Sequence, residues 1–185
     1  MQAMRPLKSS DILMAAPTVQ TVLVLDEQPD TAATLSALLP EPGGRVLAGN
    51  SLEYLASLNR EQMESVSVIF LSSSLPSTPG AESRLTVEDI ETRLLPFFPL
   101  AALVLLENDC PLDLQGRVSV QMTVARLTRP LDPDATRQAL DAAQTFHAWL
   151  RAAFWRWNSR TSQDVFEESI ARILHDINNQ ITGIK

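Results

Sequence analysis

Residues 21–30 read TVLVLDEQPD, and the fold follows from this stretch. Its first five residues are apolar or β-branched without polar alternation, which is typical of a parallel strand covered on both faces. The run ends at the acids Asp26 and Glu27, and a helical pattern follows Pro29. A buried strand that ends in acids and passes into a helix predicts one β-loop-α unit of a parallel sheet.

Four further segments repeat the strand pattern, and helical patterns alternate with them. Thr86, with Asp89 three residues later, marks one helix start, and Asp132 followed by Pro133 marks another. We therefore expect an α/β fold, a doubly wound five-stranded parallel sheet with a long C-terminal helical extension. The other strands are expected at residues 45–48, 66–71, 100–106 and 120–127, and the helices at 31–39, 51–59, 86–95 and 133–157.

The composition is that of a protein with a core. Among 185 residues, 45% are hydrophobic and 20% are charged, which excludes disorder as the main state. A net charge of −7 argues against nucleic-acid binding. The chain has neither a signal sequence nor an apolar run long enough for a bilayer, so we expect a cytoplasmic protein without membrane partners. A single cysteine, Cys110, fits a reducing compartment and, with only two histidines, makes a zinc site implausible.

The chain divides into four parts by pattern. We expect a mobile leader at 1–19, the α/β domain at 20–143, a helical linker at 144–160 and the start of a truncated terminal helix at 161–185. The terminal part carries an apolar seam close to a heptad, and such a seam predicts a homodimer through this helix. The seam consists of Phe166, Ile170, Ile173, Ile177, Ile181 and Ile184.

The strand order and loop residues over residues 22–143 resemble the receiver domain of two-component signalling proteins. In that family an acid pair after the first strand binds Mg²⁺, an Asp after the third strand accepts a phosphoryl group, and a Lys-Pro follows the fifth. Asp26 and Glu27 stand at the acid pair, and Leu75-Pro76 matches the residues that follow the acceptor. The resemblance implies the receiver, flavodoxin-like fold; an unrelated flavodoxin-like module is the alternative.

Three positions depart from the family pattern. Ser72 stands at the acceptor, Arg129 replaces the Lys, and no clear hydroxyl residue follows the fourth strand. A neutral serine hydroxyl cannot replace a carboxylate as acyl-phosphate acceptor or as Mg²⁺ ligand. The sequence therefore predicts a phosphorylation-incompetent pseudo-receiver without a metal. Asp26 and Glu27 are the candidates for a metal site, and the alternative is that they are solvated loop acids or helix caps.

Residues 174–184, LHDINNQITGI, resemble the H-box of histidine protein kinases. The resemblance makes His175 the phosphoacceptor. Asp176 would orient and polarise its imidazole, and Asn179 would assist one turn later. The alternative is an exposed histidine on an amphipathic helix.

A histidine kinase also needs an ATP-binding domain, and this chain has no glycine-rich phosphate loop. We therefore expect no cofactor in this chain, and ATP with Mg²⁺ only with a catalytic domain beyond it. The predicted function is the N-terminal regulatory region of a cytoplasmic sensor histidine kinase, with a response regulator or another signalling protein as partner. The alternative is a non-enzymatic, receiver-like adaptor that dimerises through its C-terminal helix.

Two features of the long helix are interpreted as structural and not as catalytic. His147 is expected to be a surface residue. An aromatic cluster near the helix end is expected to combine core packing with a helix–helix joint, and a partner surface is its alternative. The cluster comprises Phe146, Trp149, Leu150, Phe154, Trp155 and Trp157.

Overall fold

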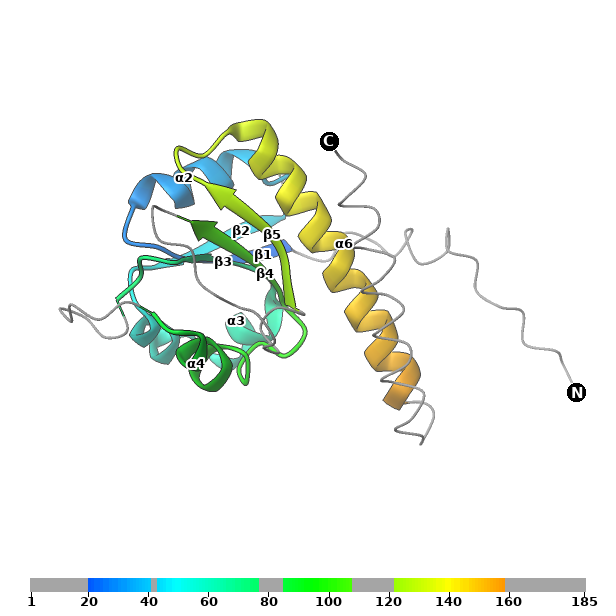
Figure 1. The fold of residues 1–185 in the computed structure, drawn as a ribbon. Coiled ribbons are helices and arrows are strands. Elements are labelled where there is room, and N and C mark those ends of the chain that lie inside the picture. Colours follow the sequence, from blue (N-terminus) through cyan, green and yellow to red (C-terminus); the bar gives the residue numbers. More distant parts are fainter. Residues whose placement is uncertain (1–19, 41–42, 77–84, 108–121, 159–185) are drawn as a thin grey trace, which may run out of the picture.

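The computed structural model describes residues 20–40, 43–76, 85–107 and 122–158. Five parallel strands form one sheet in the order β2-β1-β3-β4-β5, with helices on both faces (Figure 1). This confirms the expected doubly wound α/β fold. The strands are β1 Gln20–Leu25, β2 Gly44–Gly49, β3 Val66–Ser72, β4 Ala102–Glu107 and β5 Thr123–Thr128.

Alternate residues of the central strands enter two separate cores. In β1, Leu23 and Leu25 belong to the core on one face, whereas Val22 and Val24 belong to the core on the other. All four side chains are buried. Because helices cover both faces of a parallel sheet, both positions of the alternation are apolar. This is the physical reason for the unbroken apolar run at residues 22–25.

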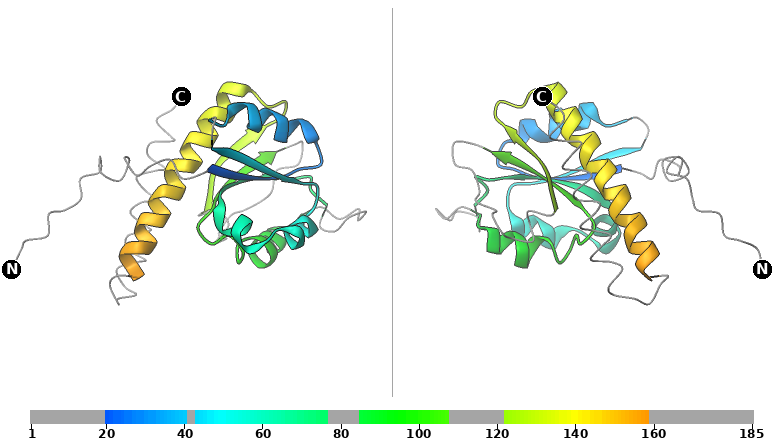
Figure 2. Two further views of the ribbon diagram at one scale, coloured as in Figure 1. Left: turned by 180° about the vertical axis from the view of Figure 1, so that it is seen from behind. Right: turned by 45° about the vertical axis from the view of Figure 1, so that its right-hand side comes forward.

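The two faces are covered by different helices. Helices α2 and α6 lie on one face, and η1, α3, α4 and η2 lie on the other (Figures 1 and 2). Leu35 of α2 and Phe146 of α6 share one core, and Leu55 of η1 and Ile90 of η2 share the other. The bounds are α2 Pro29–Leu38, η1 Leu52–Ser57, α3 Arg60–Ser65, α4 Val87–Asp89, η2 Ile90–Leu94 and α6 Pro133–Asn158.

The connection between β2 and β3 differs from the prediction of one helix at 51–59. The structure has the 3₁₀ helix η1 followed by the separate helix α3. Asn59 is the reason, since its side chain accepts a hydrogen bond from the Gln62 backbone N–H at 2.9 Å. The Gln62 side chain in turn accepts one from the Asn59 backbone N–H at 2.9 Å. This reciprocal capping box begins a new helix at the residue where the sequence pattern predicts the end of one.

The helix predicted at 86–95 begins as expected but changes character. The Thr86 hydroxyl caps the backbone N–H of Asp89 at 3.2 Å, and the Asp89 carboxylate accepts from the Thr86 backbone N–H at 3.0 Å. After α4, however, the chain continues as the π-helical segment η2. There the Leu95 N–H donates to the Ile90 carbonyl at 2.9 Å.

Helix α6 begins at the predicted residue and extends past the sheet. The Asp132 carboxylate accepts a hydrogen bond from the Ala135 N–H at 2.8 Å, so the predicted cap is present. Its 26 residues span about 39 Å, whereas a six-residue strand spans about 20 Å. The first part packs on β5, β4 and β3, and the last turns extend beyond the strands (Figure 2). The long C-terminal helical extension is therefore confirmed.

Within the described part of the chain, none of the helices has the length and apolar character needed to cross a membrane.

Candidate functional site

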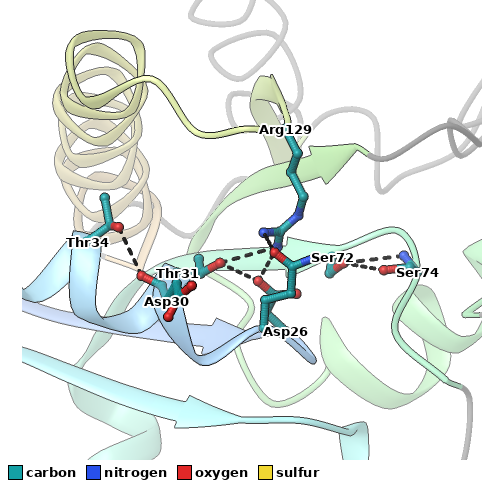
Figure 3. A network of polar contacts seen from close by, with 8 residues as sticks. Asp26, Asp30, Thr31, Thr34, Ser72, Ser74 and Arg129 are labelled. Atoms are coloured by element: carbon teal, nitrogen blue, oxygen red, sulfur yellow. Dashed lines mark hydrogen bonds and ion pairs between the residues drawn. The ribbon is translucent and has the colours of Figure 1, made fainter.

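The polar residues singled out in the sequence gather at the carboxyl edge of the sheet. Asp26 follows β1, Ser72 is the last residue of β3, and Arg129 follows β5 (Figure 3). In doubly wound folds, ligands bind outside the carboxyl ends of the strands, where the loops converge. This edge is therefore the candidate functional site.

The Asp26 carboxylate is buried and ion-paired. Its side chain is 1% exposed, and its Oδ2 accepts hydrogen bonds from the Thr31 hydroxyl and from Nη2 of Arg129. The other carboxylate oxygen, Oδ1, has no hydrogen-bond partner in the described structure. A buried carboxylate needs a compensating charge, and Arg129 supplies it.

Arg129 reaches from the loop after β5 to the loop after β1. Besides Asp26, its guanidinium donates from Nη1 to the Gln28 side-chain oxygen and from Nη2 to the Thr31 hydroxyl, the latter at 3.2 Å. The arginine side chain is 15% exposed. A planar guanidinium can serve several oxygen acceptors at once, which the ammonium of a lysine cannot do with the same geometry. One side chain thus joins two loops at this edge.

Ser72 is enclosed and bonded within its own loop. It is fully buried, and its Oγ lies 2.9 Å from Oγ of Ser74. The backbone N–H of Ser73 donates to the Leu106 carbonyl at 2.9 Å, which holds this loop to the end of β4. A neutral hydroxyl therefore occupies the end of β3, on the same edge as the Asp26–Arg129 pair.

These residues do not fit the Mg²⁺ site that the receiver resemblance implies. Such a site needs several hard oxygen ligands, with at least one carboxylate free to bind the ion. Here Asp26 is paired with Arg129, Ser72 carries no charge, and Glu27 is exposed. Among the residues that the structure describes, no group of three or more potential metal-ligating side chains comes together.

His147 is not the surface residue expected from the sequence. It is half-buried, and its Nδ1 lies 2.7 Å from the backbone oxygen of Leu100. Since a carbonyl oxygen only accepts, Nδ1 carries the proton and donates. Burial lowers the pKa of His147 below its usual 6.5; the bond to Leu100 opposes this shift, and the positive charge of Arg151 adds to it. The helical pattern alone does not indicate that Leu100, which precedes β4, lies against this position.

This lowered pKa predicts a loss of stability in acid. A histidine that is harder to protonate in the folded state makes its full contribution above the unfolded pKa of 6.5 and loses it as the pH falls through the folded value. We expect the free energy of unfolding to fall below about pH 6.5, with a contribution from this group of at most about 1.4 kcal/mol per pH unit.

Urea unfolding measures the free energy of unfolding of the wild type and of His147→Gln from pH 5 to pH 8. All other titratable groups are the same in the two proteins, so the difference between the two free energies reports on His147 alone. The difference between the two proteins should change with pH mainly below neutrality. A difference that is constant over this range would contradict the assignment.

The aromatic cluster on α6 divides into two sets. Phe146 and Leu150 are buried in the core, which confirms core packing for these two residues. Trp149 is 41% exposed and Trp155 is 65% exposed, so these two side chains are not part of the core, and the predicted helix–helix joint stays a prediction. The side chain of Trp157 lies outside the described residues.

The predicted kinase residues also lie outside the described residues. These are His175, Asp176 and Asn179, together with the apolar seam of the terminal helix. Two participants in the site were not recognised in the sequence, namely Gln28 and Thr31. Their only signal is their place in the loop and first turn after Asp26.

Neither a protein-family model nor a curated protein matches this chain. Solved structures do. A response regulator receiver domain protein from Clostridium thermocellum is 20% identical, with 68% of this chain and 94% of that chain covered and a TM-score of 0.50. A sensor protein from Polaromonas sp. JS666 is 17% identical, with coverages of 69% and 98% and a TM-score of 0.52. An adenylate cyclase from Rhodopirellula baltica is 15% identical, with coverages of 75% and 97% and a TM-score of 0.57. The fold of this chain is therefore receiver-like.

Proposed function

We propose that this chain is the N-terminal regulatory region of a cytoplasmic sensor histidine kinase, in which a phosphorylation-incompetent pseudo-receiver is joined to a dimeric helical stem. Ser72 carries the proposal. The receiver-like fold places this neutral, fully buried hydroxyl at the end of β3. Receiver phosphorylation requires a carboxylate at the corresponding place.

The chemistry of the edge supports the loss of phosphorylation. An acyl phosphate forms only on a carboxylate, and its Mg²⁺ needs that carboxylate among its ligands. Ser72 offers neither a charge nor an accessible oxygen, since its Oγ is bonded to Ser74. Asp26 is already neutralised by Arg129. The fold is kept, and the groups that perform the reaction are replaced.

Helix α6 supports a regulatory role for the domain. It packs on three strands of the sheet and continues unbroken to Asn158, and His175 follows later in the sequence. A partner that binds the domain and shifts α6 would act on the stem. In this proposal two chains associate through the terminal helix, His175 receives the phosphoryl group, and a response regulator takes it.

The exposure of Trp149 favours a second candidate function. An exposed tryptophan on a helix is a typical contact for another protein. The chain would then be a non-enzymatic, receiver-like adaptor that dimerises through its C-terminal helix. The two candidates differ in whether the full-length gene product incorporates phosphate from ATP.

The proposed function predicts that the domain is inert to small phosphodonors. Acetyl phosphate with Mg²⁺ should leave residues 20–143 unmodified, because no described carboxylate stands at the end of β3. Intact-mass spectrometry of the chain, followed by peptide mapping, measures this directly.

A response regulator with a complete acid site, treated in the same solution, shows that the phosphodonor is active. Ser72→Ala is the matched variant and should give the same result as the wild type. A phosphoryl group on any residue of 20–143 that is absent in Ser72→Ala would show that Ser72 is an acceptor and would overturn the proposal. A group present in both proteins would locate a different acceptor and would overturn it equally.

A further inference from the structure

Three oxygen acceptors of the β1–α2 region converge on one cation. They are the carboxylate of Asp26, the side-chain oxygen of Gln28 and the hydroxyl of Thr31, and all three contact the Arg129 guanidinium. Oxygen groups of this kind are also the ligands of hard divalent cations. In this chain the positive charge at these oxygens comes from the Arg129 side chain and not from a bound ion.

Because the Asp26–Arg129 ion pair is buried, the folded state needs the positive charge of Arg129. The Asp26 side chain is 1% exposed, and an isolated carboxylate at such a position is strongly unfavourable. Removing one partner of a buried ion pair leaves the other uncompensated, so the effect greatly exceeds that of an exposed pair. The fold therefore depends on a cation at this place.

We propose that Arg129 is the resident cation of this edge, taking the place of a divalent metal ion at Asp26 and fastening the β5–α6 loop to the β1–α2 loop. The domain then holds this arrangement without metal or phosphate. Because α6 begins four residues after Arg129, the same contact fixes the start of the helix that leaves the domain. This proposal concerns residues 26–31 and 129 only, and it stands or falls independently of the role of His175.

The test is thermal unfolding of the chain with and without millimolar Mg²⁺. The wild-type midpoint should not respond to Mg²⁺. Arg129→Ala should unfold about 10 °C lower, as expected for an uncompensated buried charge in a domain of this size. Mg²⁺ should then raise the midpoint of Arg129→Ala by about 3 °C, the shift for free ion at roughly ten times its Kd, since the cation can reach the vacated carboxylate.

Two control variants locate the effect. Arg126→Ala removes an arginine within β5, whose ion pair with Glu107 at 2.7 Å is more exposed than that of Arg129. This variant should shift the midpoint by less than about 3 °C without any Mg²⁺ response. The double variant Asp26→Asn with Arg129→Ala should recover part of the lost stability and should lose the Mg²⁺ response, because the charge that needs a cation is gone.

Two results of these measurements would overturn the proposal. Stabilisation of the wild type by Mg²⁺ as large as that of Arg129→Ala would overturn the proposal, and so would an Arg129→Ala midpoint no lower than that of Arg126→Ala. If Arg129→Ala does not fold, Arg129→Lys provides the comparison. A lysine keeps the charge but cannot bond Asp26, Gln28 and Thr31 together, so its midpoint should lie below that of the wild type. A midpoint equal to that of the wild type would contradict the proposal.

Discussion

His175→Ala in the full-length gene product should abolish ATP-dependent autophosphorylation, leaving no label on the protein. The reason is chemical: a neutral imidazole nitrogen is the nucleophile of the proposed reaction, and an alanine has none. The label on the wild type should be a phosphoramidate, labile to acid and stable to base. Radiolabel retention after acid and base treatment, with peptide mapping, measures both properties.

Two further variants test whether the label depends on His175 alone. Asp176→Asn should lower the rate by about 10²–10⁴-fold without relocating the label, because an orienting carboxylate assists the reaction but does not carry the phosphoryl group. His147→Gln is the control histidine variant and should retain the label. His147→Ala is less suitable, since the bond to Leu100 means that its removal also affects folding. Label that survives in His175→Ala would contradict the assignment of His175 as the phosphoacceptor and would leave the terminal helix with a structural role only.

The double variant Ile173→Asp with Ile177→Asp should abolish self-association of the chain. Both residues belong to the apolar seam at Ile170, Ile173, Ile177, Ile181 and Ile184. Each isoleucine that is buried on association contributes about 1.5–3 kcal/mol before entropic costs, and a buried unpaired carboxylate reverses that gain. Sedimentation equilibrium over a range of concentrations should show a monomer–dimer shift in the wild type and only monomer in the variant.

Trp149→Ser is the matched control for this experiment. It removes an exposed apolar side chain from α6, outside the seam, and should leave the dimer intact. If the dimer persists in the isoleucine variant and is lost in Trp149→Ser, the interface lies on α6 instead. The adaptor would then gain support, because its contact surface would belong to the described domain.

The sheet could be predicted from the sequence because its cause is local. In β1 and β3 both faces are covered, so every residue between Val22 and Leu25, and between Val68 and Leu71, is apolar. The N-caps Thr86 and Asp132 were also correct, since a cap acts within three or four residues of itself. Patterns that act over such short spans are readable without the tertiary structure.

What the sequence did not predict depends on contacts between distant segments. Arg129 and Asp26 are 103 residues apart, and β3 and β4 lie between their strands, so their contact depends on how the loops after β1 and β5 meet at the sheet edge. His147 donates a hydrogen bond to the Leu100 carbonyl, and a helical pattern cannot predict a contact with a residue 47 positions away. Helix α3 is a different case. The capping box of Asn59 and Gln62 that begins it can be read from the sequence, but the apolar pattern predicts only a helix that ends at Asn59.

The most direct measurement is a residue-resolved phosphorylation map of the full-length gene product, treated with ATP and Mg²⁺ and, separately, with acetyl phosphate and Mg²⁺. We expect a single phosphohistidine at His175 with ATP, and no phosphoryl group between residues 20 and 143 with either donor. A phosphoryl group on Ser72 or on an acid of the receiver-like domain, or an unmodified His175 in a protein that incorporates phosphate from ATP, would contradict the proposed function.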